Sequence, residues 1–270
     1  MIPAQFDYVA AESTAHALGL LAEHGEDAKL LAGGHSLLPM MKLRLAQPEV
    51  LIDIGGLTEL AGVRMDGNEL VVGATTRHAD LAASELVRAE APLLAYAASQ
   101  VGDPQIRHRG TIGGSLSHAD PAADLPMALV ALGGSVELQG PGGSRTVSAD
   151  DFFQGFFETA MQPEELLTAV RVPRRPGVPW GYQKFVRRAN DWAIVGVAAV
   201  GGRIALANMG SKPLRATAAE EALASGASAA EAAQHAADGT SPGEDMHADR
   251  EYRRHLARVL TRRALEHETG

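Results

Sequence analysis

A strand, a glycine pair, a helix and a second strand follow one another near the start of the chain, and this order strongly limits the possible fold. Residues 29–32 form a short apolar run that ends at Gly33-Gly34, and residues 50–54 (VLIDI) form a second one. The intervening segment, 36–44, has the apolar spacing of a helix. Two short strands joined through a helix predict a parallel βαβ unit with a right-handed crossover.

The rest of the chain alternates between helical and strand patterns. A helix at 13–24 is predicted to begin at Ser13 as N-cap and to stop at Gly25. Further helices are predicted at 78–84, 91–99, 216–225, 227–237 and from 249 to about 267. Strands are predicted at 70–72, 135–138, 165–172, 183–186, 193–200 and 203–207. This mixture predicts an α+β fold.

A stretch rich in proline and glycine, RRPGVP at 174–179, predicts a domain boundary. We therefore expect one domain at 1–173, with parts at about 1–55 and 56–173, and a second domain at 180–270. A chain of 270 residues that is 46% hydrophobic is long and apolar enough to bury a sizeable core.

The composition excludes several functional classes. The chain has no Cys, so it cannot by itself form disulfides, use a thiolate nucleophile or hold zinc or iron–sulfur centres through cysteine. A net charge of −9 disfavours non-specific binding to nucleic acid, which depends on Lys and Arg. Residues 1–10 lack the charged and apolar regions of a signal peptide, and we find no stretch that could span a bilayer, so we expect a cytoplasmic protein.

The first glycine pair lies in the segment 31–36 (LAGGHS), between a predicted strand and a predicted helix. Backbone N–H groups at such a junction can converge on an anion, and glycine lets a phosphate approach closely. Taken alone, the pair is also compatible with a simple tight turn. The segment matches neither the dinucleotide fingerprint nor a P-loop, and Ser36 lacks the second glycine of a hydrolase nucleophile elbow.

A second glycine pair lies in the segment 107–126, RHRGTIGGSLSHADPAADLP. Its polar residues and turn signals favour an exposed functional loop over a buried element. Gly113-Gly114 predicts a second group of convergent N–H donors, and Asp124 is a carboxylate suited to the hydroxyls of a sugar or polyol. A metal site formed by His118, Asp120 and Asp124 is an alternative. We disfavour it because the spacing of these three residues matches no known ligand pattern.

Together, the two glycine segments resemble the FAD-binding medium subunit of the molybdenum hydroxylases, the family of xanthine dehydrogenase and aerobic carbon monoxide dehydrogenase. The segments concerned are AGGHSLLPMMKLRL at 32–45 and RGTIGGSLSHADPAADLP at 109–126. The resemblance extends over nearly the whole chain, including KFVRRANDWAIVGVAA at 184–199 and EYRRHLARVLTRRAL at 251–265. Two long motifs at the separation usual in the family make the resemblance specific.

The resemblance implies a two-part FAD-binding domain of the vanillyl-alcohol-oxidase (PCMH) type, followed by a small α+β C-terminal domain, with FAD held in extended form. The residues that it implies as FAD-binding are Ala32, Gly33, Gly34, His35, Ser36, Thr111, Gly113, Gly114, Ser115, Asp124 and Lys184. Val101 and Leu167 fall at further contact positions. Ser115 departs from the family, which usually has Asn there, and a hydroxyl makes fewer hydrogen bonds than an amide.

The resemblance also implies partners and a role in electron transfer. In this family a large subunit oxidises the substrate at a molybdopterin, a small subunit carries two [2Fe–2S] clusters, and FAD passes the electrons to an external acceptor. The absence of Cys agrees with such a role, and no catalytic or metal-binding residue is implied on this chain. Two other functions stay open: a flavin- or nucleotide-binding module without a redox role, and a free-standing NAD(P)H-dependent flavin reductase, which would need a nicotinamide site that we do not find.

Three further features allow alternative interpretations. Trp192 and Ile194 lie where the family usually covers the flavin ring, but Trp192 could equally be a core aromatic. The four phenylalanines of DFFQGFFET, at 151–159, favour a place in the core. The arginine-rich face of the last helix favours a solvated surface, or docking to an acidic partner subunit, over nucleic-acid binding.

Overall fold

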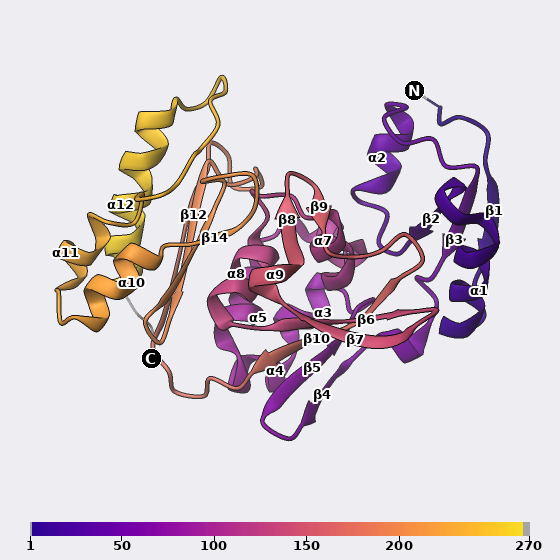
Figure 1. Cartoon of the computed structure of the whole chain (residues 1–270), viewed down its shortest axis with the longest axis horizontal. Helices are drawn as coiled ribbons and strands as arrows, with labels where there is room; N and C mark the ends of the chain where they lie inside the picture. Colours follow the sequence, from indigo (N-terminus) through magenta and orange to yellow (C-terminus); the bar gives the residue numbers. More distant parts are fainter. Residues whose placement is uncertain (1, 267–270) are drawn as a thin grey trace.

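The computed structural model describes residues 2–266, which form four sheets and the helices around them. Figure 1 shows the N-terminal unit at one end, a helix-rich unit in the centre, and a sheet with its own helices at the other end. The α+β class predicted from the sequence is confirmed. No helix in this part of the chain is long and apolar enough to cross a bilayer.

The N-terminal unit contains a parallel sheet. Its strands lie in the order β1 (Asp7–Ala10), β3 (Val50–Asp53) and β2 (Ala28–Leu31). The helical segments here are α1 (Thr14–His24), η1 (Gly25–Asp27), α2 (Leu37–Lys42) and η2 (Thr58–Leu60). Ala17 and Leu21 of α1 are buried in the same cluster as Ile52, and the Ser13 side chain caps α1 by accepting a hydrogen bond from the His16 amide. The predicted βαβ unit, β2-α2-β3, is confirmed, whereas the sequence analysis missed the mostly exposed β1.

The central unit contains an antiparallel sheet. Its strands lie in the order β4 (Val63–Asp66), β5 (Glu69–Gly73), β10 (Leu166–Pro173), β6 (Ser135–Gly140) and β7 (Gly143–Ser148). The helices are α3 (His78–Ala83), α4 (Glu85–Glu90), α5 (Pro92–Ser99), α6 (Pro104–Arg109), α7 (Ile112–His118), α8 (Asp124–Leu132) and α9 (Ala149–Phe152). A small ribbon is formed by β8 (Phe153–Gly155) and β9 (Glu158–Thr159).

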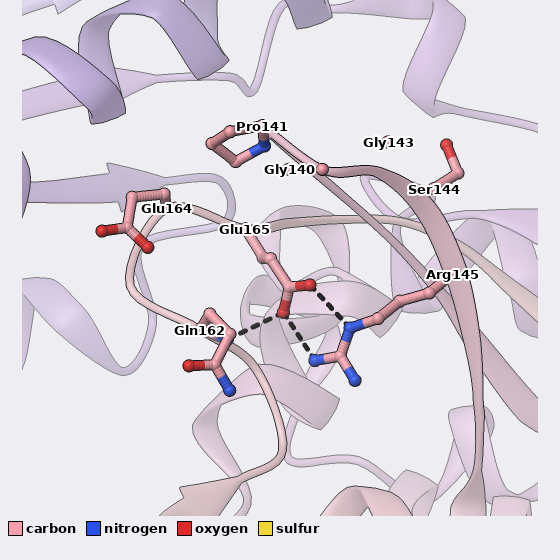
Figure 2. A pocket seen from close by; sticks show the side chains of 9 residues that line it. Gly140, Pro141, Gly143, Ser144, Arg145, Gln162, Glu164 and Glu165 are labelled. Atoms are coloured by element: carbon pink, nitrogen blue, oxygen red, sulfur yellow. Dashed lines mark hydrogen bonds and ion pairs between the residues drawn. The ribbon is translucent and has the colours of Figure 1, made fainter.

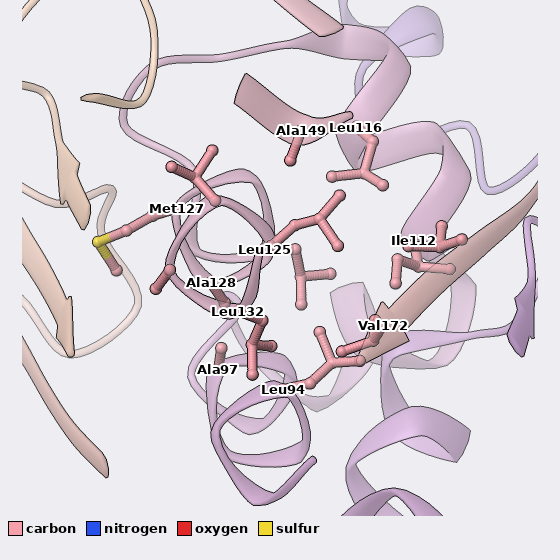
Figure 3. Packing of buried hydrophobic residues seen from close by; sticks show 14 of the residues in the cluster. Leu94, Ala97, Ile112, Leu116, Leu125, Met127, Ala128, Leu132, Ala149 and Val172 are labelled. Carbon is pink, nitrogen blue, oxygen red and sulfur yellow. The ribbon is translucent and has the colours of Figure 1, made fainter. Parts of the chain in front are cut away.

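Helix α8 lies at the centre of the main core. All its residues are buried, and Figure 3 shows Leu125 and Leu132 of α8 among side chains from α5, α7 and β10. Burial on every side leaves no polar face, so the sequence of α8 has no helical period by which it could be recognised. This explains why the sequence analysis did not predict α8.

The third sheet lies between α8 and α12. Its antiparallel strands are β11 (Trp180–Phe185), β12 (Val195–Val200), β13 (Arg203–Ala207) and β14 (Leu214–Arg215). Its helices are α10 (Thr217–Ala224), α11 (Ala229–Ala233) and α12 (Arg250–Glu266). Ala198 and Val200 of β12 join the core around α8, while Val197 and Ala199 join the cluster around α12. Because both faces are covered, β12 is buried throughout, and its sequence is a continuous apolar run without alternation. The predicted end of the last helix, at about His267, lies outside the described residues.

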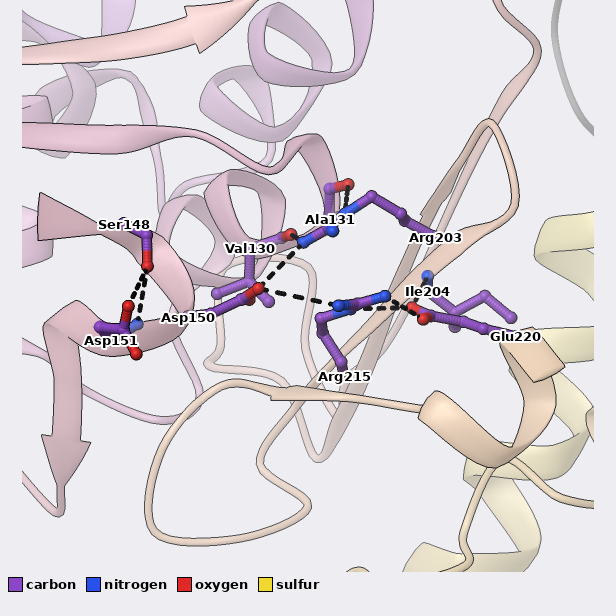
Figure 4. A network of polar contacts seen from close by, with 9 residues as sticks. All are labelled: Val130, Ala131, Ser148, Asp150, Asp151, Arg203, Ile204, Arg215 and Glu220. Atoms are coloured by element: carbon purple, nitrogen blue, oxygen red, sulfur yellow. Dashed lines mark hydrogen bonds and ion pairs between the residues drawn. The ribbon is translucent and has the colours of Figure 1, made fainter.

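Polar contacts also join the third sheet to the central unit, as Figure 4 shows. Arg203 of β13 donates to the carbonyls of Val130 and Ala131, at 3.0 and 3.1 Å. These carbonyls belong to the last turn of α8, where the Val130 carbonyl also accepts from the Gly133 amide at 3.2 Å, so the guanidinium adds a side-chain cap to the helix end. Asp150 forms ion pairs with Arg203 at 3.3 Å and with Arg215 at 3.7 Å.

Two expectations for individual segments were wrong in part. The segment 107–126 is largely helical rather than an exposed loop, and Ile112, Gly113 and Leu116 of α7 are buried. Of the four phenylalanines, Phe152 and Phe153 are buried in the core, but Phe156 and Phe157 are 65% and 43% exposed at the β8–β9 turn. In both segments the packing partners come from distant parts of the chain and cannot be recognised from local composition.

The arginines of α12 bind the protein's own backbone. Arg253 is buried, and its guanidinium donates to the Ile194 carbonyl and pairs with Asp245 at 2.6 Å. Arg254 and Arg258 donate to carbonyls of the preceding segment at 3.3 and 3.1 Å. This part of the basic face therefore holds loops in place, which differs from the purely solvated surface favoured by the sequence.

Candidate functional site

The first glycine segment presents a row of free backbone donors. It leaves β2 and enters α2, and among the described residues none of the amides of Gly33, Gly34, His35 and Ser36 donates a hydrogen bond within the chain. Gly34 has a φ of +78°, a left-handed conformation that glycine adopts without strain. Successive amides in such a turn form an anion-binding concavity. The interpretation of this segment as an anion site therefore fits its geometry.

The second glycine segment is built differently. Thr111 caps α7 by accepting a hydrogen bond from the Gly114 amide at 3.1 Å, and the Ser115 amide donates to the Thr111 carbonyl at 3.0 Å. The Ile112 and Gly113 amides donate to the carbonyls of the 74–76 segment at 3.0 and 2.8 Å. The predicted second group of convergent donors is thus not formed, because these four amides already have partners. Gly114 and the Ser115 side chain remain accessible to a ligand.

The glycines allow the two segments to meet. A Cβ on Gly33 would lie 2.8 Å from the Cα of Gly110 and even closer to the Arg109 carbonyl, so only glycine permits this approach. Likewise, a Cβ on Gly113 would lie 2.7 Å from the carbonyl oxygen of Ala74. The structure therefore brings the two segments singled out from the sequence into direct backbone contact.

His78 lies beside this junction. The charges of His35, Arg107 and Arg77 all act on His78, whose imidazole is buried beside Gly110. Burial and these positive neighbours together lower the pKa of His78 to about 4, so the ring is neutral at pH 7. Its Nδ1 atom has no partner among the described residues. The sequence analysis missed Arg77 and His78, since TTRH at 75–78 matches no motif.

Asp124 and Lys184, the remaining candidates, bind each other. Lys184 Nζ lies 3.0 Å from Asp124 Oδ2 and 3.2 Å from the Gln100 carbonyl oxygen, and the Tyr182 hydroxyl donates to Asp124 Oδ1. Burial raises the pKa of Asp124, while the nearby Lys184 ammonium acts in the opposite direction. Both oxygens of Asp124 have partners inside the protein. The carboxylate therefore does not face an open site, although the sequence analysis expected it to bind ligand hydroxyls. Tyr182 was not recognised from the sequence.

The candidate residues thus form two clusters related by α7. The glycine cluster lies at the start of this helix, and Asp124 follows its end, while Figure 1 shows α7 between α2 and α8. The side chains of Asp124 and Lys184 are 3% and 8% exposed and paired with each other, so this second cluster offers a ligand no free polar group.

Trp192 lies in the loop between β11 and β12. Its side chain is 56% exposed, which excludes the alternative of a core aromatic. The end of this loop is fixed, because the Ile194 carbonyl accepts from Arg253 and the Asn208 side chain donates to Ala193 O at 2.8 Å. Trp192 is therefore an exposed indole on an anchored loop.

No group of three side chains suited to hold a metal occurs in residues 2–266. The His118 ring packs against that of Phe157 in a tilted arrangement, with the ring centroids 4.8 Å apart. Asp120 accepts a hydrogen bond from the Ala122 amide at 2.8 Å. Val101 and Leu167, the other positions suggested by the resemblance, belong to the main core or pack against it.

Two surface pockets lie away from the Asp124 cluster. Figure 2 shows the first, beside the β6–β7 turn, where Arg145 and Glu165 form a two-point ion pair with a shortest distance of 2.7 Å. The second pocket, of about 210 Å³, is lined by Gly55, Gly56, Arg77 and their neighbours, and it adjoins the glycine junction.

Two parts of the chain match known protein families. Residues 4–175 match the FAD binding domain in molybdopterin dehydrogenase, and residues 180–267 match the CO dehydrogenase flavoprotein C-terminal domain. The chain belongs to this family of FAD-binding subunits. The fold and the cofactor implied by the sequence resemblance are thereby confirmed, and the flavin subunit is part of an oxidoreductase.

Relatives match the flavin subunit over nearly its whole length. The carbon monoxide dehydrogenase medium chain of Hydrogenophaga pseudoflava is 45% identical over 98% of this chain and 97% of the relative. The 6-hydroxypseudooxynicotine dehydrogenase complex subunit alpha of Paenarthrobacter nicotinovorans is 39% identical over 98% of this chain and 95% of the relative.

Solved structures agree with the sequence comparison. The carbon monoxide dehydrogenase of Hydrogenophaga pseudoflava that lacks the Mo-pyranopterin moiety superposes with a TM-score of 0.95 at 46% identity, covering 98% of both chains. The quinoline 2-oxidoreductase of Pseudomonas putida 86 superposes with a TM-score of 0.92 at 33% identity, covering 98% of this chain and 97% of the other.

Proposed function

We propose that this flavin subunit provides the electron exit of a three-subunit molybdenum hydroxylase. When bound, FAD supplies the redox chemistry, because it takes electrons from an iron–sulfur centre and passes them to an external acceptor. The observation that carries the proposal is the row of four free amides from Gly33 to Ser36, which lies against the backbone of Arg109 and Gly110. A diphosphate is the ligand that such a site fits best.

We assign the proposed contacts according to the chemistry of each group. The amides of Gly33, Gly34, His35 and Ser36 would hold the diphosphate, with Ala32 leading into the turn. The accessible Gly114 and Ser115 would border the same ligand, while Thr111 and Gly113 position α7. Lys184 and Asp124 would contribute to the FAD site indirectly, because their buried ion pair fixes β11 against the first turn of α8.

The proposed partners are a large subunit with the molybdopterin and a small subunit with two [2Fe–2S] clusters. Relatives named as medium chains or complex subunits support this assignment. The absence of Cys also supports it, because the iron–sulfur centres then require another chain.

We further propose that residues 1–173 and 180–270 are the two domains and that the complex works in the cytoplasm. The ion pair of Arg174 with Glu90, at 2.5 Å, fixes the first residue of the connecting segment. Limited proteolysis between 174 and 179 tests the boundary, and cell fractionation tests the location.

Anaerobic reduction of the purified complex tests the electron-transfer role. Carbon monoxide, glyceraldehyde and caffeine, which appear in the names of relatives, are suitable first substrates. We expect one of the substrates of this enzyme class to bleach the flavin absorbance through the partner subunits. Rapid bleaching of the isolated chain by NAD(P)H would instead favour a flavin reductase, and a flavin that no electron donor reduces would favour a module without redox role.

A further inference from the structure

The backbone around Arg77 fixes the start of α7. Arg77 pairs with Thr111 in an isolated antiparallel bridge. On either side, the Ile112 amide donates to Thr76 O and the His78 amide donates to Gly110 O, both at 3.0 Å. The second glycine segment is therefore held against the residues that carry the Arg77 side chain.

The Arg77 side chain joins this segment to the N-terminal unit. Its Nη1 donates to the Arg109 carbonyl, and its Nη2 lies 3.5 Å from the Gly55 carbonyl oxygen. Gly55 in turn lies against Ala32, because a Cβ on Gly55 would be 3.2 Å from the Ala32 carbonyl oxygen. Gly33 closes the arrangement through its contact with Arg109. One guanidinium thus connects the end of α6 with the turn that follows β3, and both lie against the first glycine segment.

Both hydrogen bonds of the Arg77 side chain go to backbone carbonyls. Among the described residues, no carboxylate forms an ion pair with Arg77. Arg77 is also partly buried, next to the positive Arg109. Burial and Arg109 lower the pKa of Arg77, while the carboxylates of Asp80 and Asp53 act in the opposite direction without forming an ion pair with it. A further anion near the guanidinium would reduce the cost of its burial. The diphosphate proposed for the adjacent row of amides would be such an anion.

We propose that Arg77 is a positioning residue of the FAD site, holding the amides of Gly33 to Ser36 in the orientation that binds the diphosphate. Its rigid, forked guanidinium can donate to two carbonyls at once, which a lysine ammonium does only with poorer geometry. This inference rests on the proposed function and adds a residue outside the two glycine segments.

The test compares ligands with and without a diphosphate on the flavin-depleted complex. The variants are Arg77→Met and Arg77→Lys, with Arg64→Met as control because Arg64 is exposed and forms one long ion pair of 3.9 Å. The ligands are FAD and ADP, which contain the diphosphate, and riboflavin, which does not. We expect Arg77→Met to raise the dissociation constants of FAD and ADP at least tenfold, Arg77→Lys to raise them less, and riboflavin binding to stay unchanged.

Unchanged binding of FAD and ADP by Arg77→Met would overturn the inference. An equal rise in the dissociation constant of riboflavin in Arg77→Met, together with a lower unfolding temperature, would also overturn it. Arg77 would then only support the fold. If Arg77→Met does not fold, Arg77→Lys decides the matter through the same comparison of ADP with riboflavin. Failure of the wild-type complex to bind FAD would instead contradict the proposed function itself.

Discussion

Lys184 Nζ lies 3.0 Å from Asp124 Oδ2, and this buried ion pair ties β11 of the third sheet to the first turn of α8. Removal of one partner from a buried pair leaves an uncompensated charge. Lys184→Met should therefore lower the free energy of unfolding by about 3–5 kcal/mol. Chemical denaturation monitored by circular dichroism provides the measurement.

The double variant Asp124→Asn with Lys184→Met is the control for this prediction. Because neither charge then remains, it should be more stable than Lys184→Met alone. If the loss in the double variant equals the sum of the losses in Asp124→Asn and Lys184→Met, the two side chains do not depend on each other and the prediction is wrong.

His78 should make stability depend on pH. Its folded pKa of about 4 is below the ordinary value of 6.5, so the unfolded chain binds the proton more readily between these values. The neutral His78 ring therefore contributes about 3 kcal/mol to the free energy of unfolding. This contribution is fully present above pH 6.5 and is lost as the pH falls to 4. Unfolding midpoints of wild type and His78→Gln across this range check the prediction. The control is His255→Gln, on the exposed face of α12. If His78→Gln keeps the full pH slope of the wild type, this assignment is wrong.

Gly33→Ala should affect both stability and flavin content. The new methyl group would lie 2.8 Å from the Cα of Gly110 and press on the protein's own backbone, which costs about 1–3 kcal/mol. Separation of the two segments should also lower FAD occupancy. Gly19→Ala is a suitable control, since a Cβ there has no neighbour within 4 Å. Full flavin content and wild-type stability of Gly33→Ala would contradict the close contact described here.

Trp192→Ala should alter the flavin without harming the fold. The indole is 56% exposed, so its removal should change stability by only about 0.5 kcal/mol. If the indole covers the flavin ring, as the family resemblance implies, the absorbance band and the rate of reoxidation should change. Phe156→Ala, which truncates another exposed aromatic side chain, is the control. An unaltered spectrum and reoxidation rate would remove Trp192 from the site.

The sequence was informative where local patterns determine structure. The strand at 29–32 and the glycine turn after it predicted the βαβ unit, and the apolar run at 193–200 predicted a strand that forms as β12 (Val195–Val200). In these segments burial requires apolar residues and the turn requires glycine, so both can be recognised from the order of residue types. Family resemblance then supplied the cofactor, which local patterns alone left open.

Contacts between distant segments could not be predicted in this way. Gly113 reads as a ligand-binding glycine, but its lack of a side chain permits packing against Ala74, which only the folded chain brings near. Similarly, Asp124 and Lys184 were both singled out, yet nothing in their spacing shows that they bind each other. The role of Arg77 depends on carbonyls from two other segments and has no sequence signature at all.

The flavin released from the purified complex tests the central claim most directly. Acid precipitation followed by chromatography identifies the flavin and its amount per copy of this chain. The account predicts one FAD per chain, released without covalent attachment, because the free amides of Gly33 to Ser36 suit a diphosphate. Release of FMN alone, flavin that stays in the precipitate, or a complex without flavin would contradict it.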